Sequence, residues 1–138
     1  YDAVTITITI NDAKTNAGNR IVPIHPKLSS LFSKLTSASG SDYLFKSLTT
    51  DKYDNRTDAL GKRFGRAKKK LSFDKRYVFH SIRKTVATLL EQADVPENVC
   101  CDIVGHEKSA TLSYGLYSGG TSLEQKRSAV DKIDYSFE

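Results

Sequence analysis

The sequence has 138 residues, of which 38% are hydrophobic and 27% are charged, with a net charge of +5. This length suits one domain with a buried core. No apolar run approaches the roughly 20 residues that span a bilayer, which excludes a transmembrane helix, and no signal peptide is visible. Cys100 and Cys101 are adjacent and lack the spacing of a zinc site, so we expect reduced thiols in a cytosolic protein.

The N-terminal end is predicted to form a β-hairpin. From Val4 to Ile10, isoleucine or valine alternates with threonine, which is the period-two pattern of a strand. Turn residues follow at 16–19, and residues 20–24 are predicted to be a returning strand. Pro23 has no N–H to donate to a sheet, so we expect this strand to lie on an edge.

The remainder of the chain is predicted to be helical. Gly105 is expected to end one helix, Thr57 or Asp58 to cap another, and Thr121 with Glu124 to form a capping box for the last. Helical spacing of apolar residues predicts helices over 28–35, 60–71, 79–93, 97–104, 110–117 and 121–133. The sequence therefore predicts a mainly helical α+β fold with a small antiparallel hairpin sheet near the N-terminus.

Positive charge is concentrated between Lys52 and Arg76. This block holds ten Lys or Arg and three Asp, a net charge of +7, so the rest of the chain carries −2. A cationic block in a near-neutral body is typical of a protein that binds a polyanion, although a solvated surface is an equal alternative. The basic residues predicted to contact DNA lie on the helix over 60–71: Lys62, Arg63, Arg66, Lys69 and Lys70.

Two histidines and an arginine are candidate site residues. His80 and Arg83 are three apart on the longest predicted helix, so they share one side of it. Arginine offers a two-pronged donor to a phosphate, and histidine can bind a phosphoryl oxygen or move a proton near neutral pH. His106 follows the helix-ending Gly105. Each motif alone fits an ordinary structural role, and no third ligand has a spacing that suggests a metal site.

The order of these motifs resembles the tyrosine recombinase (phage integrase) family. The segment 79–90, which contains His80-Ser-Ile-Arg83, is similar to the family's His-x-x-Arg helix, and 102–107 is similar to its Leu-Gly-His box. The segment 14–24 resembles the hairpin that carries a mobile lysine. A tyrosine follows His106 before a small residue. The resemblance covers the chain from about Val4 to Gly120.

The resemblance implies a role for each matching residue. Lys14 matches the general acid that protonates the leaving 5′ oxygen. His80 matches a histidine that assists proton movement and holds the phosphate, and Arg83 matches an arginine of the phosphate clamp. His106 matches a residue that binds a non-bridging oxygen or packs the site. Tyr117 matches the nucleophile that forms a 3′-phosphotyrosine link to DNA, without a metal or other cofactor.

Tyr114 remains an alternative nucleophile. The family's usual spacing of nine residues from the Gly-His histidine fits neither tyrosine. We favour Tyr117 because the Ser118-Gly119 that follows it resembles the small residues after the family's nucleophile.

The resemblance leaves one catalytic residue unmatched. The family has a second catalytic arginine upstream of the hairpin, and Arg20, in the returning strand, does not match it. Since Tyr1 is not a natural start, we expect residues 1–138 to be a recombinase catalytic domain truncated at its N-terminal side. We expect this fragment alone to bind DNA weakly and to cleave it poorly.

The function that the resemblance implies is site-specific recombination of double-stranded DNA. The parent protein would integrate or excise a phage or other mobile element as a homo-tetramer, in the bacterial cytoplasm at the nucleoid and with no membrane partner. A non-catalytic DNA-binding module that uses the basic helix, and a type IB topoisomerase, remain the alternatives.

Overall fold

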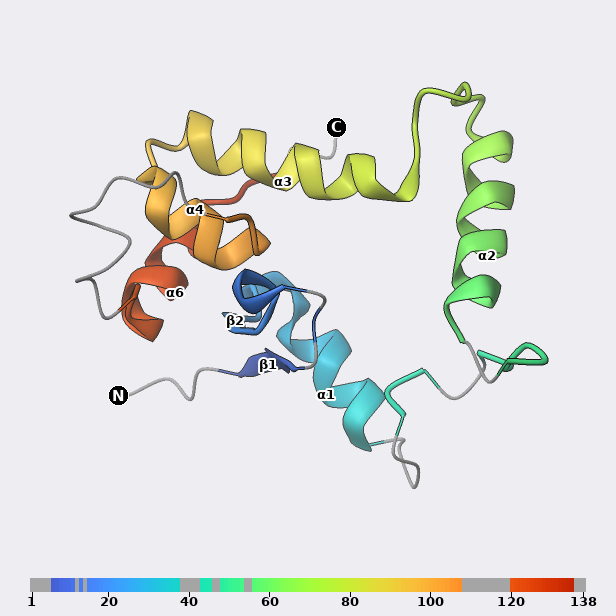
Figure 1. Cartoon of the computed structure of the whole chain (residues 1–138), viewed down its shortest axis with the longest axis horizontal. Coiled ribbons are helices and arrows are strands. Elements are labelled where there is room, and N and C mark those ends of the chain that lie inside the picture. The colour runs from blue at the N-terminus through green and yellow to red at the C-terminus, as the bar shows by residue number, and fades with distance from the viewer. Residues whose placement is uncertain are drawn as a thin grey trace. The chain divides into compact units, whose positions relative to one another are not determined.

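The computed structural model of the chain describes residues 6–11, 13, 15–37, 43–45, 48–53, 56–107 and 120–135, and the structural statements refer to these residues. They fall into two compact units, the first within 1–29 and 84–138 and the second within 30–83. The described residues form five α-helices, two 3-10 helices and two strands, and Figure 1 labels the α-helices and strands. The predicted fold class, mainly helical with a small antiparallel sheet near the N-terminus, is confirmed. None of the described helices is long and apolar enough to cross a membrane.

The first unit contains the predicted hairpin. β1 (Thr7–Ile10) pairs antiparallel with β2 (Arg20–Pro23), and the 3-10 helix η1 (Asn16–Gly18) lies in the turn between them. Thr7 lies opposite Pro23 at one end of this two-stranded sheet. The edge position expected for Pro23 is confirmed, because its missing N–H interrupts no pairing with a further described strand.

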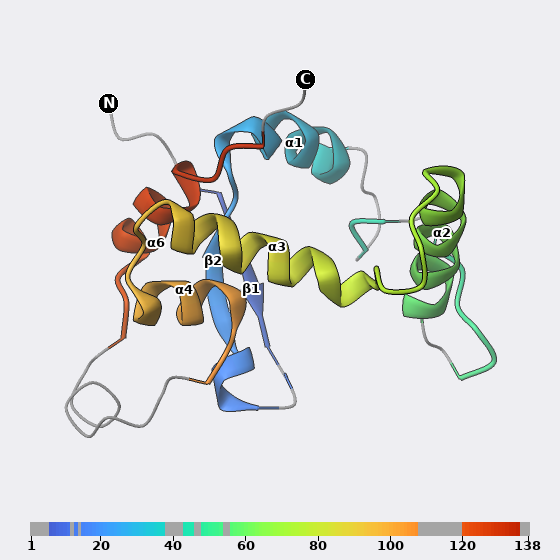
Figure 2. The same cartoon turned by 90° about the horizontal axis from the view of Figure 1, so that it is seen from above.

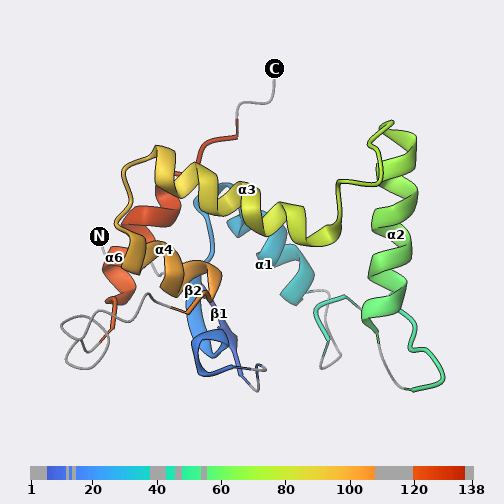
Figure 3. The same ribbon diagram turned by 45° about the horizontal axis from the view of Figure 1, so that its top comes forward.

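Three helices complete the first unit around one core. They are the C-terminal part of α3 (Phe79–Gln92), α4 (Glu97–Val104) and α6 (Leu123–Asp131), and Figures 2 and 3 show α4 and α6 beside β2. Leu90 is fully buried, and burying a leucine side chain stabilises a fold by about 2–3 kcal/mol. The residues buried in this core are Leu90, Val95, Val99, Ile103, Val104, Ala129 and Val130.

Two of these helices end in left-handed residues. After α3, Asp94 has φ 52°, and the Val95 N–H donates to the Leu90 carbonyl at 3.0 Å. After α4, Gly105 has φ 75°, as its predicted role as a cap requires. The bounds predicted for α4 and the cap at Gly105 are therefore confirmed.

The second unit carries most of α1 (Ser29–Ser37) and all of α2 (Thr57–Lys70). Every residue of both helices is described, and neither helix contains a buried residue. The 3-10 helix η2 (Pro26–Leu28) precedes α1, so the first predicted helix begins at Ser29 rather than Leu28.

Two predicted helix caps are wrong by one or two residues. The N-cap of α2 is Arg56, and neither Thr57 nor Asp58 caps it with a side chain, because both already lie within the first turn. The capping box of α6 is formed by Ser122 and Gln125. The predicted box began at Thr121, whose side chain is instead bonded to α4.

Candidate active site

The start of α3 carries the predicted pair His80 and Arg83. His80 is exposed and Arg83 is half-buried. The Arg83 Nε is buried and has no hydrogen-bond partner among the described residues. The first turn of α3 contains no acidic residue, so the partial positive charge of the helix N-terminus adds to the charge of the guanidinium. This arrangement can bind a phosphate or another small oxyanion.

Contacts within the second unit hold the start of α3 in place. The Val78 N–H donates to Ser81 Oγ at 3.0 Å, and the Ser81 N–H donates to the Val78 carbonyl at 2.8 Å. The Phe79 ring meets Phe64 of α2 edge to face, with centroids 5.3 Å apart. Lys68 Nζ, also on α2, donates to the carbonyl of Tyr77 at 2.8 Å. The basic helix and the His80–Arg83 pair therefore belong to one packed unit.

The predicted DNA-contacting residues form one face of α2. At about 100° per residue, their side chains fall within an arc of about 120°, next to the apolar stripe of that helix. Lys62 forms an ion pair of 2.7 Å with Asp58, and this hydrogen bond raises the pKa of Lys62. The side chains on this basic face are all exposed: Lys62, Arg63, Arg66, Lys69 and Lys70.

The turn that carries His106 lies in the first unit and is held by several hydrogen bonds. The N–H groups of Gly105 and His106 both donate to the Cys101 carbonyl, at 2.7 and 3.1 Å, which closes α4 as a Schellman-type end. Arg20 Nε donates to the Ile103 carbonyl at 2.9 Å. His106 itself is exposed.

A second contact joins α4 to the start of α6. Asp102 accepts from the hydroxyl of Thr121 at 2.6 Å and from its N–H at 3.2 Å. His106 and Thr121 flank the segment that contains both candidate tyrosines. The two ends of that segment are therefore anchored to the same helix, α4.

The model of the phage integrase family matches residues 2–117. The chain belongs to this family. Its members are tyrosine recombinases, which act on DNA. Searches of curated proteins and of solved structures gave no match.

The structure describes part of the integrase site that the sequence predicts. His80, Arg83 and the basic face of α2 lie in the second unit, and His106 lies in the first. Lys14, Tyr114 and Tyr117 lie outside the described residues.

Sequence reasoning missed two residues whose contacts hold α4, the helix that precedes His106. Arg20 was considered only as a catalytic arginine, and its bond to the end of α4 has no local sequence signal. Asp102 lies in the predicted motif, but its pairing with Thr121 spans 19 residues and has no spacing rule. Both contacts are tertiary.

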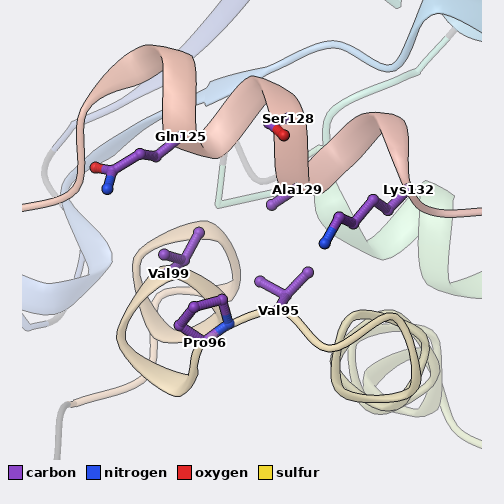
Figure 4. A pocket seen from close by; sticks show the side chains of 7 residues that line it. All are labelled: Val95, Pro96, Val99, Gln125, Ser128, Ala129 and Lys132. Carbon is purple, nitrogen blue, oxygen red and sulfur yellow. The ribbon is translucent and has the colours of Figure 1, made fainter.

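Other candidate sites in the described part of the chain do not include the predicted residues. A pocket with a volume of about 180 Å³ lies between α4 and α6. Its walls include Val95, Val99 and Lys132 (Figure 4) but none of the predicted site residues that the structure describes. Among the described residues, no three His, Cys, Asp or Glu side chains come together to hold a metal ion. Burial raises the pKa of the Cys100 thiol, which keeps it protonated near neutral pH.

Proposed function

We propose that this integrase-family chain is the catalytic domain of a site-specific recombinase that cuts and rejoins double-stranded DNA. The main support for the proposal is that the buried Nε of Arg83 lacks a hydrogen-bond partner among the described residues. Leaving a buried donor unpaired costs about 1–3 kcal/mol or more. A DNA phosphate could satisfy this donor once the half-buried side chain shifts to expose Nε, and His80 lies one turn away at the same helix end.

The reaction we propose is a transesterification. The phenol of Tyr117 gives its proton to His80 and its oxygen attacks the scissile phosphorus. The bond to the 5′ oxygen breaks, and a 3′-phosphotyrosine forms. Lys14 donates a proton to the leaving 5′ oxygen, and Arg83, His80 and His106 stabilise the charge on the non-bridging oxygens. Attack by a 5′ hydroxyl of another strand reverses these steps, so each strand exchange conserves the phosphodiester bond and needs no cofactor.

The basic face of α2 would hold the DNA backbone near this site. Its five cationic side chains are exposed, and a set of this kind binds phosphates with little dependence on base sequence. The contacts between α2 and residues 77–79 link this face to the start of α3. DNA bound to α2 would therefore be held by the unit that presents Arg83.

The proposed function also implies an assembly and a biological setting. We propose that residues 1–138 belong to one catalytic domain and that four protomers act together on two DNA sites. The family's upstream arginine has no match in this sequence, so a second arginine would complete the phosphate site. Integration or excision of a mobile element at the bacterial nucleoid is the setting we propose.

A non-catalytic DNA-binding module is the second candidate, because the basic face of α2 could bind DNA without any nucleophile. A DNA duplex nicked next to the scissile phosphate separates the two, since the cleaved strand diffuses away and traps the covalent intermediate. The assay uses the longest natural form of the protein.

Our proposal predicts a covalent adduct in the wild type and in Tyr114→Phe, and none in Tyr117→Phe. The reverse pattern would move the nucleophile to Tyr114. DNA binding without an adduct in any of the three proteins would support the binding module. Relaxation of supercoiled DNA without strand exchange would instead indicate a topoisomerase.

A further inference from the structure

Arg20 bridges two parts of the first unit that carry predicted site residues. Its Nε donates to the Ile103 carbonyl in the last turn of α4 at 2.9 Å, and its Nη1 donates to the Gly18 carbonyl in the hairpin turn at 2.6 Å. The Ile103 carbonyl is one of those that a helix end leaves without an intrahelical partner. The positive charge also suits the partial negative charge at the C-terminus of α4.

Gly105 provides the space that this bridge needs. A Cβ at this position would lie 2.5 Å from Arg20 Nη1 and 2.7 Å from its Cζ, so the guanidinium lies directly against the backbone of Gly105. Gly105 also has φ 75°, a conformation that side chains other than glycine seldom adopt. His106 is the next residue, and its N–H is bonded to Cys101 in the same turn. The guanidinium thus covers the turn from which His106 extends.

The other end of the bridge reaches the hairpin loop next to Lys14. The Ala13 N–H donates to Asn19 Oδ1 at 2.8 Å, and a Cβ on Gly18 would clash with the Ala13 Cβ. The loop is therefore closed tightly at Ala13 and Gly18. Arg20 is bonded to the Gly18 carbonyl, so one side chain connects this loop to the end of α4.

We propose that Arg20 is a positioning residue that fixes the backbone of His106 relative to the hairpin. This inference rests on the proposed recombinase function for its effect on the reaction. Arg20 touches no DNA in this account and acts through the Gly105–His106 turn. A lysine cannot replace it, because a single ammonium nitrogen lacks the rigid fork with which Nε and Nη1 reach two carbonyls.

The test compares Arg20→Lys with the matched control Arg127→Lys in the longest natural form of the protein. Arg127 is bonded to Asp131 within α6 and has no hydrogen bond or ion pair to a predicted site residue that the structure describes. The rate of adduct formation is measured at saturating nicked DNA, together with the Kd for DNA and the free energy of unfolding. A misplacement of about 1 Å can lower a rate by about 100-fold, so we expect Arg20→Lys to lose at least about 10-fold in rate. The Kd should change by less than about threefold, and Arg127→Lys should match the wild type.

A double-mutant cycle separates positioning from general weakening of the fold. In a His106→Ala background, Arg20→Lys should cause no further loss of rate, because the residue that it positions is gone. An equal loss in both backgrounds would overturn the proposal, and so would a wild-type rate in Arg20→Lys.

Hydrogen exchange tests the positioning without the reaction. The N–H groups of Gly105 and His106 should exchange faster in Arg20→Lys and unchanged in Arg127→Lys. If the wild type forms no adduct, the proposed function fails, while this measurement still decides the structural role. Unchanged exchange at both amides in Arg20→Lys would overturn the inference.

Discussion

Replacing Gly105 with alanine places a methyl group where the guanidinium of Arg20 lies. The new Cβ would be 2.5 Å from Nη1, so the arginine side chain must move and give up its bonds to Ile103 and Gly18. Losing hydrogen bonds of this kind costs about 1–3 kcal/mol. The left-handed backbone at φ 75° adds about 1–2 kcal/mol for a residue with a Cβ. We therefore expect Gly105→Ala to lower the free energy of unfolding by about 3 kcal/mol.

Making Gly105→Ala in an Arg20→Ala background separates the cost of the lost Arg20 hydrogen bonds from the cost of backbone strain. With the guanidinium absent, only the backbone strain remains, so the alanine should cost about 1–2 kcal/mol. Urea unfolding followed by circular dichroism measures all four proteins of the cycle. An equal cost of Gly105→Ala in both backgrounds would refute the close approach of Arg20 to this turn.

Three further predictions concern other parts of the chain. Gly61→Ala and Gly65→Ala should each stabilise the protein by up to about 1 kcal/mol, because a Cβ at either position meets nothing within 4 Å; destabilisation in thermal melts would argue against the helix as described. Changing Arg66, Lys69 and Lys70 to glutamine should make the slope of log K for DNA against log salt concentration shallower by about 0.9 per lost phosphate contact. The same change in charge at Lys27, Lys126 and Lys132 should have little effect on this slope. Equal effects of the two triple variants would show that the basic face is not part of the DNA interface. Because burial raises the pKa of Cys100, its alkylation by iodoacetamide near pH 7.5 should be slower than that of a free thiol and should accelerate only at higher pH; a fast reaction at neutral pH would contradict the burial.

Local signals in the sequence were enough to predict the fold class and most elements. The alternation near Ile8 gave the strand, and the glycine after Val104 gave the end of α4, because both depend on neighbouring residues alone. The capping box of α6 was placed one residue early, at Thr121, because Thr121 with Glu124 and Ser122 with Gln125 both fit the capping-box pattern. Only the bond of Thr121 to Asp102, a tertiary contact, decides between them.

The candidate site was predictable where it lies on one element. His80 and Arg83 lie together because they are three positions apart on one helix, and the face of α2 follows from the same periodicity. The role of Arg20 was not predictable, because 83 residues separate it from Ile103. The division of the chain into two compact units also has no signal in composition, since α3 runs through the boundary between them.

The phosphate site at the start of α3 is tested most directly by comparing Arg83→Ala with Lys84→Ala. The two residues are adjacent on α3 and carry the same charge, but Lys84 is exposed and Arg83 has the buried Nε. The rate of covalent adduct formation on nicked DNA should fall by about 100- to 1,000-fold in Arg83→Ala, as it does when a transition-state donor is removed. Lys84→Ala should stay close to the wild type, with DNA affinity similar in both variants. Equal rates in the two variants, or a loss in Arg83→Ala that lies only in DNA affinity, would contradict a catalytic phosphate site at Arg83.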